Sequence, residues 1–259
     1  MKESSWFDPF YLTDHLNDEE LDIQKNVREF CNKELLPNVI EHNRNHYFDK
    51  NIYKSFGSLG ILGPTIKEFG GAGTNNIAYG LIAYEVEKID SSYRSAVSVQ
   101  SSLVIHPIYN FGSDEQKKEY LPELIKGNMI GCFALTESEA GSDPSSMKTH
   151  YEETKDEFIL NGSKSWITNA PIADVFIIWA LSEKKEINAF ILDKNTKGLN
   201  TSYIKNKTSL KISPTGQIIL NNVRVPKNKI LPKTIGWKSV FSCLNKARYG
   251  ISWGVLGSA

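Results

Sequence analysis

A short strand followed by a loop of small and acidic residues is the feature that most constrains how this chain folds. It reads Gly131-Cys-Phe-Ala-Leu-Thr-Glu-Ser-Glu-Ala-Gly-Ser-Asp143. The apolar run from Cys132 to Leu135 predicts a buried strand. The loop after it leaves backbone N–H groups free, an arrangement that suits an anion.

A second stretch, Asn161-Gly-Ser-Lys-Ser-Trp-Ile-Thr-Asn169, follows farther along the chain. Its Asn-Gly pair lies between Phe158–Leu160 and Ser163–Thr168, and Asn-Gly is the strongest short signal for a hairpin turn. We therefore expect a β-turn at Asn161-Gly162 that brings an aromatic and a hydroxyl group onto the returning strand, where they can hold a flat heteroaromatic ring. From spacing alone, an ordinary hairpin with a buried Trp166 is the favoured explanation of the pattern.

The motifs Phe-Ala-Leu-Thr-Glu, Ala-Gly-Ser-Asp, Asn-Gly and Trp-Ile-Thr-Asn, in this order and spacing, resemble the acyl-CoA dehydrogenase family. The resemblance implies FAD as cofactor. It places one group of residues against the isoalloxazine, a second near the pyrophosphate and the substrate, and a third along the other flavin edge with Thr168 near N5. These groups are Phe133, Ala134, Leu135 and Thr136; Gly141 and Ser142; and Trp166, Ile167 and Thr168.

A polar stripe lies on the predicted helix between Ser92 and Val104. Arg94, Ser98 and Ser101 or Ser102 recur at spacings of three and four residues, so they share one helix face. A guanidinium on such a face can bind a carboxylate bidentately. The competing interpretation is an arginine at a helix start that pairs with Asp90.

Two longer runs are similar to glutaryl-CoA dehydrogenases in particular. The first extends from Glu85-Val-Glu87 through Tyr93-Arg-Ser-Ala-Val-Ser to His106-Pro-Ile-Tyr109, and the second from Cys243 to Gly257. The resemblance implies that Arg94 anchors the distal carboxylate of a dicarboxylic acyl chain, and it leaves open whether Arg248 is only a surface arginine. The substrate-binding residues that it implies are Glu87, Arg94, Ser95, Ser98, Ser142, Asn245, Arg248 and Tyr249.

The implied activity is oxidation of glutaryl-CoA, with decarboxylation to crotonyl-CoA and CO2, as a step of lysine and tryptophan degradation. Electrons would pass to an electron-transferring flavoprotein, and the full-length enzyme would be a homotetramer. The family carries its catalytic glutamate in a helical bundle that would lie beyond Ala259, so we expect a fragment of a longer protein, inactive by itself. The alternatives are an acyl-CoA dehydrogenase of other chain specificity and a non-catalytic flavin or acyl-CoA binding fragment.

The predicted fold class is α+β in three parts. Residues 1–128 are expected to form an all-α domain, residues 129–234 a β-barrel-like middle domain, and residues 235–259 the first helix of a truncated helical domain. Helix-period patterns predict an opening helix from Asn17 to Asn43 with a break at Pro37, and a further helix from Asn75 to Ile89. In the middle domain, charged hairpin tips are expected at Glu183–Glu186 and a turn at Asn221-Asn222.

Composition excludes several classes of protein. Thirty basic and thirty acidic residues give a formal net charge of zero among 259 residues, so no general attraction to nucleic acid or to an anionic membrane is expected. Three widely spaced cysteines, without a C-x-x-C pair, indicate reduced thiols. The first residues resemble neither a secretion signal nor a transit peptide, which favours a cytoplasmic protein, or a processed form from the mitochondrial matrix.

No metal site is predicted. His42 and His46 have the spacing of a helical zinc pair, but they lack an adjacent glutamate and a third ligand, so they are interpreted as surface histidines. The glycine-rich stretch Gly57–Gly73 is interpreted as a loop before a helix, because no strand precedes it and the G-x-G-x-x-G frame fails at Asn76.

Overall fold

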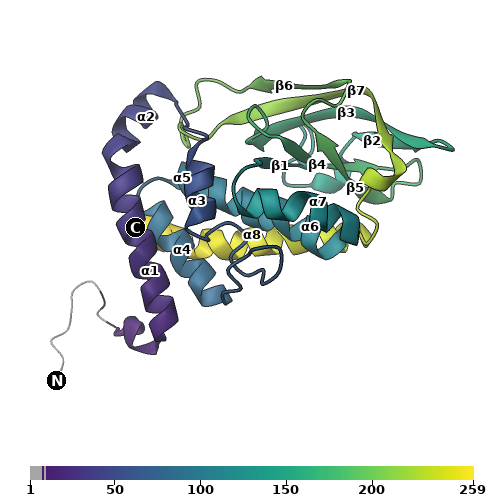
Figure 1. Ribbon diagram of the computed structural model, residues 1–259. Helices are drawn as coiled ribbons and strands as arrows, with labels where there is room; N and C mark the ends of the chain where they lie inside the picture. The colour runs from purple at the N-terminus through teal and green to yellow at the C-terminus, as the bar shows by residue number, and fades with distance from the viewer. Residues whose placement is uncertain (1–7, 9) are drawn as a thin grey trace.

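Helices form the first half of the chain, and a sheet and one long helix form the second (Figure 1). The computed structural model describes residue 8 and residues 10–259. The helices of the first half are α1 (Asp18–Phe30), α2 (Val39–Asn45), α3 (Ile52–Ser58), α4 (Asn76–Glu87), α5 (Ser91–Ser98), α6 (His106–Phe111) and α7 (Asp114–Ile125). The π-helical turn η4 (Val99–Ile105) connects α5 to α6 without a break.

The opening helix confirms the sequence prediction. The side chain of Asn17 accepts a hydrogen bond from the backbone of Glu20, whose own side chain accepts from Asn17, so a capping box fixes the start of α1. The helical path then continues through a π turn at Cys31–Leu35 and a 3-10 turn at Leu36–Asn38, which contains Pro37. The proline therefore tightens the helix locally rather than ending it.

Helix α8 (Gly236–Ser258) runs beside α4 and α5 (Figure 1). The close approach of α4 and α8 depends on glycines, because a Cβ on Gly80 would lie 2.3 Å from the ring of Trp253, and one on Gly250 would lie 3.0 Å from the hydroxyl of Tyr79. Small residues at these crossings let aromatic side chains of the opposite helix fill the space. This contact attaches the last helix of the described chain to the first helical layer.

The second half contains one curled, mixed sheet with the strand order β1-β4-β2-β3-β7-β6, and β5 pairs with β4. A helical domain beside a curled sheet, followed by a last helix, confirms the predicted α+β class. The predicted hairpin tip at Glu183–Glu186 is also confirmed, because β4 and β5 pair in antiparallel register on either side of it. The strands are β1 (Gly131–Ala134), β2 (His150–Glu153), β3 (Glu157–Thr168), β4 (Val175–Leu181), β5 (Ile187–Asp193), β6 (Leu199–Tyr203) and β7 (Thr215–Pro226).

The turns predicted at Asn161-Gly162 and Asn221-Asn222 are wrong. Both pairs lie inside the long strands β3 and β7, which pair along their full length with a register shift between Leu160 and Gly162. The amide of Asn161 donates to Asn222 Oδ1 at 3.2 Å, and the backbone N–H of Asn222 donates to Asn161 Oδ1 at 2.8 Å. The two irregular sites thus face each other as a bulge, and ladder pairing outweighs the local turn signal.

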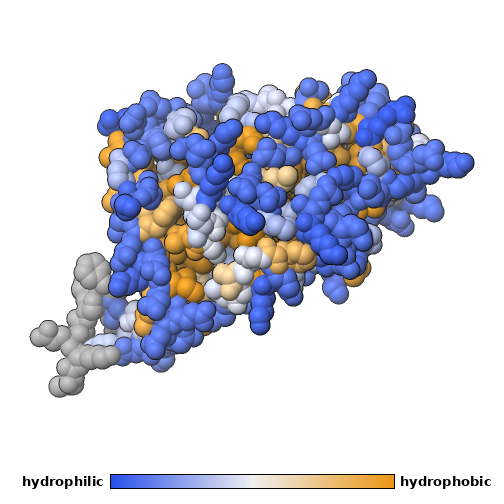
Figure 2. Space-filling model, viewed as in Figure 1, coloured by the Kyte–Doolittle hydropathy of each residue, from blue (hydrophilic) through white to orange (hydrophobic). Residues whose placement is uncertain are grey.

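Strand β1 separates two hydrophobic clusters. Phe133 and Leu135 pack into the cluster that the sheet shares with the helices, whereas Cys132 and Ala134 pack into the cluster inside the curled sheet. This division follows from the two-residue period of a strand. Figure 2 shows a largely hydrophilic face, with hydrophobic residues visible mainly around α3 and α4. Among the described helices, none has the length and apolar character needed to cross a membrane.

Candidate functional site

The exit of β1 and the end of β3 lie side by side. The backbone N–H of Ser165 donates to the carbonyl oxygen of Thr136 at 2.9 Å, which ties the loop start to β3. A register shift between Lys164 and Ile167 gives Trp166 a φ of 62° and turns its side chain outward, where it is 60% exposed. The predicted alternative of a buried Trp166 is therefore wrong, and the edge of the sheet presents an open indole surface.

Polar groups without hydrogen bonds occur on both segments of this edge. In the described part of the chain, no hydrogen bond engages the hydroxyl groups of Thr136, Ser142 or Thr168. A Cβ placed on Gly141 would meet no atom within 4 Å, so space is open in front of the loop. Free hydroxyls after β1 and at the end of β3, an exposed indole on β3 and an exposed loop of small residues are the kinds of group that hold a flat ring with a phosphate-bearing tail. The residues present thus fit FAD.

A buried ion pair forms the second part of the site. Arg94, in the first half of α5, donates from Nε to Glu87 Oε2 at 2.5 Å and from Nη2 to Glu87 Oε1 at 3.3 Å. The two side chains are 11% and 3% exposed. Asp90 instead caps α5 by accepting from the backbone of Ser92 at 2.7 Å, so the sequence interpretation that pairs Arg94 with Asp90 is wrong.

Arg94 keeps donors for a ligand. A guanidinium has five N–H groups, and within residues 8 and 10–259 only those on Nε and Nη2 have a partner, which in both cases is Glu87. Ser95 is half-buried one position along α5, and Ser98 is buried one turn on. The remaining serines of the stripe support the fold, since Ser102 bonds the hydroxyl of Tyr79 at 2.7 Å and Ser101 accepts from the backbone of Gly63 at 2.9 Å.

The three residues predicted on α8 separate into two groups. Asn245 and Arg248 are exposed and bond to each other, with Arg248 Nη1 donating to Asn245 Oδ1 at 2.9 Å. Tyr249 turns toward α4, donates to the carbonyl oxygen of Asn76 at 2.9 Å and stacks on Tyr79. Only Tyr249 of this group thus packs against a neighbouring helix.

Sequence reasoning missed Gln100, which joins the two parts of the site. Its amide donates to the carbonyl oxygens of Leu124 and Met129 at 2.9 and 2.8 Å, and its carbonyl accepts from the backbone of Gly131 at 2.9 Å. A fully buried glutamine is unusual and needs hydrogen-bond partners. The residues next to Gln100 in the sequence do not indicate which groups these partners are. Through Gln100, η4 is held against the first residue of β1.

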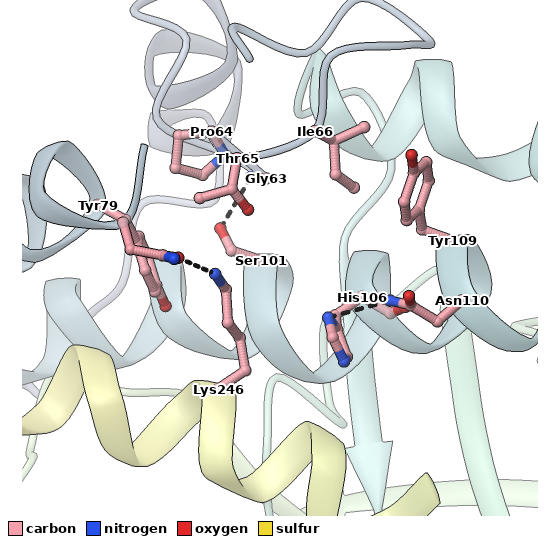
Figure 3. A pocket seen from close by; sticks show the side chains of 11 residues that line it. Gly63, Pro64, Thr65, Ile66, Tyr79, Ser101, His106, Tyr109, Asn110 and Lys246 are labelled. Carbon is pink, nitrogen blue, oxygen red and sulfur yellow. Dashed lines mark hydrogen bonds between the residues drawn. The ribbon is translucent and has the colours of Figure 1, made fainter. Parts of the chain in front are cut away.

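The pocket in Figure 3 adjoins two of the residues singled out in the sequence, because Ser101 lines it and Tyr249 contacts its lining residues Asn76 and Tyr79. Its volume is about 310 Å³, and it is lined by α4, α6, α8 and the loop Gly63–Ile66. Lys246 donates to Asn76 Oδ1 at 2.7 Å, and His106 bonds Ser242 at 3.0 Å. Burial, together with the charge of Lys246, lowers the pKa of His106 to about 4, so its ring is neutral.

No cluster of metal-ligating side chains occurs among the residues that the structure describes. His42 is bonded to the hydroxyl of Tyr93 at 2.9 Å, which gives this histidine a structural partner.

Comparison with known proteins places these features in context. The family model for the acyl-CoA dehydrogenase N-terminal domain matches residues 17–128, and the model for the acyl-CoA dehydrogenase middle domain matches residues 132–223. An acyl-CoA dehydrogenase of Bacillus subtilis is 35% identical over 251 residues, which cover 95% of this chain and 66% of that protein.

Solved structures agree with the sequence matches. A glutaryl-CoA dehydrogenase from Mycobacterium smegmatis in complex with FADH2 superposes with a TM-score of 0.94 at 43% identity, over 96% of this chain and 64% of that one. Butyryl-CoA dehydrogenase from Megasphaera elsdenii gives a TM-score of 0.89 at 33% identity, over 93% and 66% of the two chains. The chain thus spans between 64% and 66% of the length of these three proteins.

Proposed function

Because this chain belongs to the acyl-CoA dehydrogenase family, with FAD as its cofactor, we propose that its protein oxidises glutaryl-CoA. The observation that carries the proposal is the buried Arg94–Glu87 pair with free guanidinium donors. A plain acyl chain ends in a methyl group and would leave those donors without partners, which is costly in a buried site. A dicarboxylic chain ends in the carboxylate that an arginine binds best.

We assign the cofactor to the edge between β1 and β3. Phe133, Ala134, Leu135 and Thr136 would lie against the ring, Gly141 and Ser142 would bind the phosphates, and Trp166 to Thr168 would cover the remaining edge. Bound there, FAD supplies a hydride acceptor for oxidation across the α and β carbons. The exposed indole of Trp166 and the unbonded hydroxyls of Thr136, Ser142 and Thr168 support this assignment.

The residues of this chain bind and orient the substrate. Arg94 would hold the distal carboxylate while Ser95 and Ser98 line the helix face beside it, so that the reacting carbons stay in register with the β1 edge. Gln100 supports this arrangement because it joins η4 to Gly131. We place the base that removes the α proton on a glutamate of the helical bundle that follows this region in the family.

Two further steps belong to the proposal. The oxidised product, glutaconyl-CoA, is a vinylogous β-keto acid, so breaking the bond to its terminal carboxylate releases CO2, and protonation of the resulting carbanion gives crotonyl-CoA. Arg94 would orient that carboxylate until it leaves. The electrons from the oxidation would pass to an electron-transferring flavoprotein.

A second candidate is oxidation of a short unbranched acyl-CoA. It is favoured by the likeness to butyryl-CoA dehydrogenase and by the fact that Glu87 already neutralises Arg94, so that the pair can be purely structural.

Steady-state turnover of the complete gene product separates the two candidates. We expect glutaryl-CoA to be preferred over butyryl-CoA, and Arg94→Gln to remove that preference, with crotonyl-CoA and CO2 as products. Arg28→Gln is the matched control, because Arg28 also pairs with a buried glutamate, Glu85, at 2.8 Å but lies on α1. Equal rates on both substrates, with no effect of Arg94→Gln, would contradict the proposal that glutaryl-CoA is the substrate.

A further inference from the structure

Lys164 is a fully buried lysine in β3. Its side chain is 0% exposed, and its ammonium group donates to the carbonyl oxygen of Leu135 and to Glu137 Oε1, each at 2.9 Å. The sulfur of Met147 lies 3.8 Å away. A buried ammonium is costly unless it is paired and hydrogen-bonded, so a specific set of contacts must hold it.

Glu137 extends this pairing to the far end of the loop. Besides Lys164, its carboxylate accepts hydrogen bonds from the backbone N–H groups of Lys148 at 2.7 Å and Thr149 at 2.9 Å. Lys164 binds the start of the loop at Leu135, and Glu137 binds its end at Thr149. One ion pair therefore fixes both ends of a loop that spans residues 135–149.

Little holds the middle of that loop except Ala140, which is buried and exchanges backbone hydrogen bonds with Glu137. Gly141, Ser142 and Asp143 are exposed, and the bonds of Asp143 run to Ser145 and Ser146 within the loop itself. Met147 is buried, but its sulfur contacts the ammonium group of Lys164, so it is held by the same ion pair. The shape of the exposed segment is thus set by its two fixed ends and by the buried Ala140.

We infer that the Glu137–Lys164 pair is a positioning device that holds the loop from Leu135 to Thr149 in the conformation that binds the diphosphate of the flavin cofactor. The inference rests on the proposed cofactor site at Thr136, Gly141 and Ser142. Neither Glu137 nor Lys164 touches the ring edge or the substrate pair in this assignment. They act through the backbone that they bind.

This role differs from a contribution to stability. Replacing a buried ion pair by apolar residues of similar volume is often neutral or stabilising, whereas removing one partner alone leaves an uncompensated charge. An apolar pair can therefore fill the space, but it cannot bind the backbone groups of Leu135, Lys148 and Thr149.

Protonation of Lys164 provides a further distinction. Burial lowers the pKa of Lys164 to about 8, against the opposing effect of Glu137, which is the one charged group in contact with it in the described chain. Above that pH the neutral amine holds Glu137 less firmly, so cofactor affinity falls. Folding stability does not fall with it, because a lysine whose folded pKa is depressed makes the native state bind fewer protons than the unfolded state between about 8 and 10.5.

The test compares FAD affinity with thermal unfolding in the complete gene product. Affinity is measured by fluorescence of released FAD, and unfolding is followed on the FAD-free protein. For the double variant Glu137→Leu/Lys164→Met we expect an FAD dissociation constant raised about tenfold or more, together with a lower unfolding midpoint, because the backbone groups of Leu135, Lys148 and Thr149 lose their partners. Lys164→Arg keeps its charge, so its affinity should stay constant as the pH rises through about 8, where that of wild type declines.

The matched control is Glu85→Leu/Arg28→Met, which removes an ion pair between α1 and α4 in which Glu85 is buried and Arg28 is half exposed. It should leave FAD affinity within about threefold of wild type. A Glu137→Leu/Lys164→Met variant that binds FAD as tightly as wild type, or a control variant that loses as much FAD affinity, would overturn the positioning role but not the cofactor site. Wild-type protein that fails to bind FAD would overturn the cofactor site as well.

Discussion

Gly254 of α8 lies directly against the carboxylate of Glu87 on α4. A Cβ at this position would be 2.0 Å from Glu87 Oε2 and 3.3 Å from Arg94 Nε. No side chain larger than hydrogen fits between α8 and the Glu87–Arg94 pair. The proposed substrate anchor therefore depends on glycine at position 254.

The first prediction concerns Gly254→Ala. The added methyl group must displace either α8 or the Glu87–Arg94 pair, which we expect to cost about 1–3 kcal/mol of unfolding free energy and to raise KM for glutaryl-CoA more than KM for butyryl-CoA. Denaturant unfolding and steady-state kinetics measure both effects. Ile251→Ala, at an exposed position of the same helix, is the control, and equal changes in KM for both substrates would contradict the proposed anchor.

The second prediction concerns Glu87→Gln. The change leaves the buried guanidinium of Arg94 without its counter-charge, so we expect a loss of about 3–5 kcal/mol in the free protein. A bound dicarboxylate restores the missing charge. Glutaryl-CoA should therefore raise the melting temperature of the variant by more than that of wild type, as followed by scanning fluorimetry. Equal shifts in both proteins would show that the carboxylate does not reach Arg94.

The third prediction concerns Trp166→Ala. Because the indole is 60% exposed, its removal should change unfolding free energy by less than about 0.5 kcal/mol while it weakens FAD binding and alters flavin fluorescence. Ile219→Ala is the matched control, since Ile219 is 52% exposed on β7. If both variants retain wild-type FAD affinity, the proposed flavin edge is misplaced.

The fourth prediction is a pH dependence that originates at His106. Burial depresses its folded pKa from 6.5 to about 4, so the native state binds fewer protons than the unfolded state in that interval. Its contribution, up to roughly 3 kcal/mol, is complete above pH 6.5 and is lost as the pH falls toward 4. Urea unfolding across this range should show a flatter profile for His106→Gln than for wild type, whereas substitution of the exposed His150 should not flatten it.

Local signals predicted much of the fold. Asn17 with Glu20 and Ser113 with Gln116 form the capping boxes that begin α1 and α7, and each pair lies within one turn of the same helix. Such bonds close a short loop, so the residues that make them can be identified from neighbouring positions alone. The order and spacing of the motifs around β1 and β3 are likewise evident in the sequence. The structure brings two of their residues, Thr136 and Ser165, into contact.

Local signals failed where distant partners compete. Asn161-Gly162 favours a turn, yet pairing with β7 along the whole of β3 outweighs it, and Asn222 occupies the bulge. In the same way, the sequence offered Asp90 as the nearest carboxylate for Arg94, but the fold assigns Asp90 to the helix cap.

The sequence by itself determined the order of the helical and β-rich regions, the loop at Gly141 and the kinds of residue that its motifs contain. Tertiary structure alone decided that Arg94 pairs with Glu87, that Gln100 joins η4 to β1, and that Lys164 binds Glu137 across the loop. The physical reason is that a buried charge or amide must find partners wherever packing places them. Those partners are chosen by burial and geometry in three dimensions rather than by their distance along the chain.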